Sequence, residues 1–261
     1  MKTSLNNGTT RMLNKVPEIT LFFWIIKIMA TTVGETAADF LNADLHFGLT
    51  GTSLVMGVLL LVALVFQLRA KRYVPAIYWI AVVLISVFGT LVTDNLVDNF
   101  GITTKTTTII FSGALLATFA AWYASEKTLS IHSIFTTRRE LFYWVAILFT
   151  FALGTAAGDL VAEGMQLGYA ISALVFGAVI GLVTLAHYFF KLNSVLAFWI
   201  AYILTRPFGA SCGDLLSQPI ANGGLGLGTV ATTVIFLGTI LCLVSYLTIS
   251  QKKTVSAQTQ R

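Results

Sequence analysis

The chain has 261 residues, of which 56% are hydrophobic and only 10% are charged. A soluble domain carries roughly 25% charged residues, so this composition excludes an ordinary soluble fold and indicates a protein that is solvated by lipid. The formal net charge of +5 does not indicate a nucleic-acid partner, because the basic residues lie between apolar blocks and not on one face.

Eight apolar segments follow one another along the chain, separated by charged residues, proline and glycine. They cover approximately residues 18–41, 47–68, 75–97, 104–124, 141–162, 167–190, 194–217 and 227–249. Each has about the 20 residues that an α-helix needs to cross a hydrocarbon core of ~30 Å. The sequence therefore predicts an all-α, polytopic membrane protein with eight transmembrane helices. Residues 1–17 precede this membrane domain (18–250), and 251–261 form a C-terminal tail.

The distribution of basic residues predicts the orientation in the membrane. Thirteen lysines and arginines fall on the side of the N-terminus, and the opposite loops carry only Lys105. By the positive-inside rule, both termini are expected in the cytoplasm.

A fourfold internal repeat is visible in the first, third, fifth and seventh segments. In each, a Trp is followed ten positions later by Gly and fifteen positions later by Asp. The residues are Trp24, Gly34 and Asp39; Trp79, Gly89 and Asp94; Trp144, Gly154 and Asp159; and Trp199, Gly209 and Asp214. Each unit holds two predicted helices, so the chain returns to the same side after each one. The four units, at about 18–70, 73–126, 138–192 and 193–250, are therefore expected to be parallel repeats.

These repeated residues make the chain resemble a family of bacterial membrane proteins built from four tandem two-helix repeats of unknown function, each with a characteristic Trp. The resemblance covers roughly residues 18–250. It implies an eight-helix inner-membrane protein and no assigned reaction, so function has to be argued from the residues.

The repeated Trp and Gly residues have structural interpretations. Trp24, Trp79, Trp144 and Trp199 lie near the predicted cytoplasmic helix ends, where aromatic residues anchor a membrane protein at the lipid interface. The glycines form small-x-x-x-small pairs that allow close helix packing, and Gly carbonyls as ion ligands are the alternative. The packing residues are Gly34, Gly89, Gly154, Gly158, Gly209 and Gly213.

The repeated acids are the main candidates for function, because an ionised carboxylate is costly within a bilayer. One helical turn before three of them stand Glu35, Thr90 and Thr155. The candidate cation-binding or translocation residues are Glu35, Asp39, Thr90, Asp94, Thr155, Asp159 and Asp214, and the five acids among them are candidate metal ligands. If the four repeated helices pack centrally, the four Asp residues converge at one depth in an acidic vestibule. The alternative is that each Asp caps or hydrogen-bonds a neighbouring helix end.

Two basic residues within the predicted spans are interpreted as charge partners. Lys27 is expected to extend to the cytoplasmic headgroups. Arg206, beside Pro207, needs a carboxylate when buried, and Glu35 or one of the repeated Asp residues is the expected partner. Glu126 and Glu140 are expected to be exposed in a cytoplasmic loop.

The leading functional interpretation is a transporter of a hard cation, such as a proton, sodium or a divalent metal like manganese. The alternative is a membrane sensor or assembly scaffold without transport. An enzyme is not expected, because the sequence has no H-E-x-x-H motif and no nucleophile paired with a base. The sequence predicts no cofactor. The expected partners are the lipid bilayer and a small cation, and the oligomeric state stays open.

Overall fold

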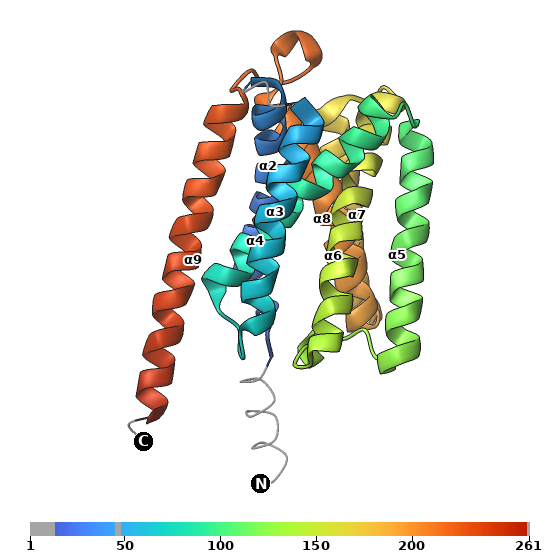
Figure 1. Ribbon diagram of the computed structural model, residues 1–261. Coiled ribbons are helices and arrows are strands. Elements are labelled where there is room, and N and C mark those ends of the chain that lie inside the picture. Colours follow the sequence, from blue (N-terminus) through green and yellow to red (C-terminus); the bar gives the residue numbers. More distant parts are fainter. Residues whose placement is uncertain (1–13, 45–47, 260–261) are drawn as a thin grey trace.

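The computed structural model describes residues 14–44 and 48–259, and these residues form eight long α-helices (Figure 1). The helices are α2 (Leu21–Asp39), α3 (Gly48–Arg69), α4 (Pro75–Asp94), α5 (Thr104–Glu126), α6 (Thr137–Asp159), α7 (Gly168–Phe190), α8 (Ser194–Ser217) and α9 (Thr229–Thr259). Each is long and apolar enough to cross a membrane. The eight predicted transmembrane segments are therefore confirmed, and the chain is a multi-pass membrane protein.

Polar residues just outside the apolar runs start several of these helices. Thr20, Thr103 and Thr136 each accept a hydrogen bond from a backbone N–H three residues later, and Asn193 caps α8 in the same way. Such caps satisfy backbone donors that a helix start leaves unpaired. Helix α4 instead begins with Pro75, which has no backbone N–H and therefore leaves no donor unpaired at this position.

The four helices that carry the Trp-Gly-Asp pattern form a closed central ring in the order α2, α4, α6, α8 and back to α2. The remaining helices lie outside it, with α3 against α4, α5 against α6, α7 against α8, and α9 against α2. The second helix of each repeat thus packs on the first helix of the next repeat. Over half of the most apolar part of each central helix is buried, against under a third for each outer helix. Lipid-facing area therefore belongs mainly to the outer helices.

The repeated glycines hold the ring together by close contact with the next helix. A Cβ atom added at any of the four would overlap or crowd the residue three positions before the glycine of the following repeat. The contacts are Gly34 with Ser86, Gly89 with Phe151, Gly154 with Arg206, and Gly209 with Thr31. The predicted packing role is therefore present at these four positions. At Gly158 and Gly213 a Cβ would find ordinary van der Waals distances of 3.6 and 3.4 Å, so these two glycines are not required by space.

The repeated Trp residues form a second closed ring, of aromatic side chains. The aromatic residue before each Trp contacts the Trp of the next repeat, with ring centroids 5.5 to 6.4 Å apart. The pairs are Phe23 with Trp79, Tyr78 with Trp144, Tyr143 with Trp199, and Phe198 with Trp24. Trp79, Trp144 and Trp199 are at most 4% exposed, and Trp24 is half-buried. The expected role as interfacial anchors is wrong for the three buried residues, because the preceding repeat supplies an aromatic neighbour inside the bundle.

Both ends of the bundle can be recognised from the repeats. The start of α2 and the end of α9 lie at the lower end in Figure 1, here called the termini end. The opposite end, here called the aspartate end, holds Asp39, Asp94, Asp159 and Asp214. Directly after the first three, the helices continue as single π-helical turns, η1 (Phe40–Asp44), η2 (Asn95–Asn99) and η4 (Leu160–Gly164). Helix α8 instead runs past Asp214 to Ser217. Such π turns are frequent at functional sites.

Candidate functional site

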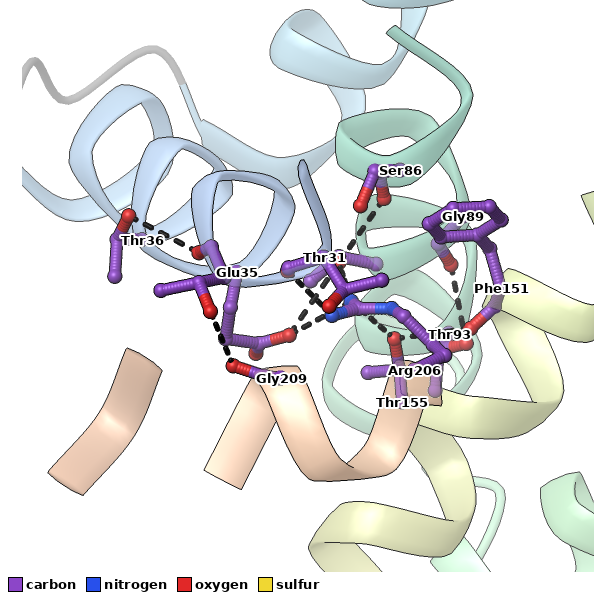
Figure 2. A network of polar contacts seen from close by, with 12 residues as sticks. Thr31, Glu35, Thr36, Ser86, Gly89, Thr93, Phe151, Thr155, Arg206 and Gly209 are labelled. Carbon is purple, nitrogen blue, oxygen red and sulfur yellow. Dashed lines mark hydrogen bonds and ion pairs between the residues drawn. The ribbon is translucent and has the colours of Figure 1, made fainter. Parts of the chain in front are cut away.

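Arg206 lies at the centre of the ring and bonds to the three other repeats. Its guanidinium donates to Glu35 Oε2 at 2.8 Å and to the Thr31 carbonyl at 2.9 Å, both on α2. It also donates to Thr90 on α4 and, at 2.7 Å, to Thr155 on α6. Figure 2 shows this cluster between the helices. The predicted ion pair with Glu35 is therefore present.

The repeats explain why one arginine fits there. Glu35, Thr90 and Thr155 each follow the glycine of their own repeat directly, and the fourth repeat has Ala210 at that position. The small alanine side chain leaves room in the layer, and Arg206 fills it from one turn away on the same helix. Arg206 is fully buried and Glu35 is 6% exposed. Hydrogen bonds to further polar groups stabilise a buried ion pair of this kind, and Thr90 and Thr155 both accept from Arg206 Nη2, whereas the buried Arg206 Nε has no partner among the described atoms.

Lys27 occupies the next layer of the ring toward the termini end. The side chain is 1% exposed, so the expectation that it reaches the headgroups is wrong. Its Nζ donates to Thr205 Oγ1 at 3.3 Å and lies 4.3 Å from the ring centroids of both Phe151 and Tyr202. No ion pair between described side chains includes it. The two aromatic faces hold the ammonium by cation–π attraction, which replaces the water that a headgroup position would have offered.

The four repeated Asp residues lie one helical turn beyond the Arg206 layer, at the aspartate end. Asp39, Asp94 and Asp159 are half-buried, and Asp214 is buried, so none of the four side chains is exposed. Asp94, Asp159 and Asp214 are each close enough to Glu35 to interact with it electrostatically. Gln218 donates to Asp39 at 3.4 Å, and a groove beside Asp39, lined also by Ser217 and Thr229, opens at this end. The four acids therefore lie at the same end of the ring, and their convergence in one vestibule stays a prediction.

The expected metal site at these acids is not formed. Among the described residues, no three His, Cys, Asp or Glu side chains are grouped so that they could hold one metal ion. The four Asp residues come from four different helices, and the layer below them is filled by Arg206 with Glu35. Within the part of the chain that the structure describes, Glu35, Asp39, Asp94, Asp159 and Asp214 thus form an acidic layer without a set of metal ligands.

A second polar network, which the sequence did not predict, closes the termini end. Lys15 Nζ donates to Glu140 Oε2 at 2.7 Å and to the Leu68 carbonyl at 3.0 Å, and Gln67 donates to Glu140 Oε1 at 3.0 Å. Glu140 is fully buried, so its expected exposure in a loop is wrong. The reason is that α6 begins at Thr137, four residues before the apolar run, which places Glu140 in its first turn. Glu126 is the more exposed acid and pairs with Arg139 at 2.7 Å.

The segment before α2 carries this network across the ring. The Lys15 backbone N–H donates to the Ile134 carbonyl, and the Tyr73 N–H donates to the Asn14 carbonyl. Because α2 and α6 are opposite members of the ring, the segment reaches from the start of α2 to the start of the opposite helix. Burial also raises the pKa of the Tyr73 phenol well above its usual value, so this side chain stays neutral there. The buried charges of Lys15 and Glu140 at the termini end are thus paired with each other.

The arrangement has one consequence for charge along the ring axis. From the aspartate end inward, a cation would meet the acidic layer, then the Arg206 and Glu35 layer, and then Lys27. An acidic opening concentrates cations from solution, whereas two buried positive groups behind it repel them. A proton can bind a single carboxylate without displacing either basic side chain.

Comparisons with known proteins identify the repeats and no activity. Four segments, residues 22–73, 77–128, 142–193 and 197–253, match the family model described as Repeat of Unknown Function (DUF347). Each segment contains most of one central helix and all or most of one outer helix. Searches of curated proteins and of solved structures gave no match.

Proposed function

The chain belongs to the DUF347 family of four-repeat membrane proteins, and from this premise we propose that it is a membrane transporter of a hard cation. The observation that carries the proposal is the acidic layer of Asp39, Asp94, Asp159 and Asp214, set inside a closed ring above the buried Glu35. Acids within a membrane domain are costly and are retained where they handle ions or protons.

Among hard cations, the proton suits this site best. Sodium and manganese need several oxygen ligands around one ion, and the described acids do not group in that way. Protonation needs one carboxylate at a time, and Glu35 lies within the same electrostatic environment as three of the repeated Asp residues. The proposal includes no catalytic role. It places both termini in the cytoplasm of a bacterium, because the basic residues concentrate at the termini end.

A proton-flux assay tests this function. The purified protein is sealed into vesicles that contain a pH-sensitive dye, and a pH difference and a membrane potential are imposed. Asp94→Asn and Asp159→Asn keep the shape of the side chain and remove its charge, so each should slow proton flux at least about tenfold. Membrane insertion should be unchanged. Glu126→Gln is the matched control, because it neutralises an acid outside the ring, and it should leave flux at the wild-type rate.

A sensor or scaffold without transport is the second candidate, and it is favoured by one observation. Arg206 and Lys27 fill the ring axis with side chains that are at most 1% exposed. The assay separates the two: Asn variants that insert correctly and conduct protons like the wild type, or a wild type without flux, would favour the sensor or scaffold.

A further inference from the structure

Lys27 and Arg206 approach the ring axis from different helices, and both lie close to the Phe151 ring. Arg206, on α8, bonds to Thr90 of the opposite helix α4. Lys27, on α2, contacts the Phe151 ring of the opposite helix α6. A side chain that reaches the opposite helix of a four-helix ring must cross its axis, so both basic groups stand on the path between the two ends.

We infer that Lys27, with Arg206, forms a positively charged barrier that excludes metal cations from the ring axis and leaves it selective for protons. The inference rests on the proposed function, which it deepens by assigning specificity to a residue outside the acidic layer. In this inference Lys27 and Arg206 exclude sodium and divalent ions, whereas the acidic layer attracts cations.

The two basic groups differ in how they are held, and this difference selects Lys27 as the residue to test. Arg206 is fixed by Glu35, two threonines and a backbone carbonyl, so its removal would leave several buried polar atoms unpaired. Among the described residues, Lys27 Nζ donates one hydrogen bond, to Thr205, and lies over two aromatic faces. Its charge can therefore be removed with less damage to the surrounding structure.

The charge balance along the axis supports a barrier. Two positive side chains, Lys27 and Arg206, face one buried carboxylate, Glu35, in the layers behind the acidic layer. The Phe151 ring lies 4.3 Å from Lys27 Nζ and 5.8 Å from Arg206 Cζ, so the two cations share one aromatic side chain. A third cation entering this region would be repelled by both at short range in a medium that screens charge poorly. A proton that moves between titratable groups does not have to pass the lysine as an ion.

The experiment compares ion selectivity in vesicles that contain wild type or Lys27→Met. Methionine has a similar length, carries no charge and makes favourable contacts with aromatic rings, so it suits the space between Phe151 and Tyr202. Proton flux, sodium flux and manganese entry are measured separately with indicator dyes. We expect wild type to pass protons and exclude both metal ions, and Lys27→Met to raise sodium flux at least about tenfold. Lys27→Arg keeps the charge and should exclude sodium as wild type does.

Chloride flux distinguishes loss of a charge barrier from a general leak. A damaged bundle would pass chloride and sodium together, whereas removal of a positive charge favours the cation alone. Lys105→Met, which changes an exposed lysine at the other end of the molecule, is the matched control and should alter none of the fluxes. If Lys27→Met does not yield folded protein, Lys27→Gln, which retains a donor for Thr205, takes its place.

Each remaining outcome overturns the inference in a recognisable way. Folded Lys27→Met that conducts protons and still excludes sodium would show that Lys27 is no barrier, with the proposed function intact. Equal rises in sodium and chloride flux would show a structural role. A wild type that passes sodium or manganese as readily as protons would show that no barrier exists, and a wild type without proton flux would remove both proposals.

Discussion

The two ends of the central ring hold acids of the same kind in contrasting surroundings. At the termini end, Glu140 is fully buried and accepts hydrogen bonds from Lys15 and Gln67. At the aspartate end, Asp94 and Asp159 are half-buried and lie within electrostatic range of other acids. The buried acid is paired, as the cost of an isolated charge requires. The acids at the other end lie near one another despite their repulsion, and the proposed function rests on this contrast.

The largest expected effect on stability comes from removing the buried ion pair between Lys15 and Glu140 at the termini end. Glu140→Gln removes the charge that balances the buried Lys15 ammonium, and breaking a buried pair in this way costs about 3–5 kcal/mol. Thermal unfolding of the purified protein in detergent, followed by tryptophan fluorescence, should show a large fall in the transition temperature. Glu126→Gln changes a partly exposed pair with Arg139 and should leave the transition temperature almost unchanged, because surface ion pairs contribute little to stability. Equal stability of the two variants would mean that the Lys15 network does not hold the termini end closed.

A medium effect is expected where the ring helices touch. Gly154→Ala places a Cβ atom against Arg206 on α8, and such overpacking costs about 1–3 kcal/mol. Gly158→Ala, one turn away on the same helix, has ordinary space and should be neutral or more stable by about 0.5–1 kcal/mol, because Ala is the better helix former. The same unfolding measurement compares the two. A loss at both positions would show that α6 and α8 pack more closely along their whole length than these contacts indicate.

The fold could be predicted from the sequence because its signals are local and repeated. Eight apolar runs of helical length and one spacing of Trp, Gly and Asp determine eight spans and four repeats. The partner of Arg206 was also predictable, since a buried guanidinium needs a carboxylate and Glu35 is the acid that lies deepest in its predicted span. The boundaries of the repeats follow from the same spacing.

The rest depends on which side of each helix faces the ring, and the sequence leaves that undecided. Lys27, near a predicted helix end, is equally compatible with the headgroups and with the ring axis. Its inward position is determined by Phe151 and Tyr202, which are distant in sequence. The sequence likewise does not determine whether each repeated Trp faces lipid or the ring. The aromatic residue that precedes all four Trp residues is the one sequence feature that favours the aromatic ring seen in the structure. Glu140 was missed because α6 starts before its apolar run.

The smallest expected effect on stability is at the aspartate end, where a substitution should leave the free energy of unfolding unchanged or raise it. Asp94→Asn removes one of several negative charges that repel one another, so unfolding free energy should stay within about 1 kcal/mol of wild type or rise. The unfolding transition in detergent measures this directly, beside Glu140→Gln as the destabilised reference. A loss of more than about 2 kcal/mol would mean that Asp94 satisfies a helix end or a neighbouring donor in the folded protein. In that case the acids at the two ends would play the same structural part, and the slower proton flux of the Asn variant would be explained by damage to the fold.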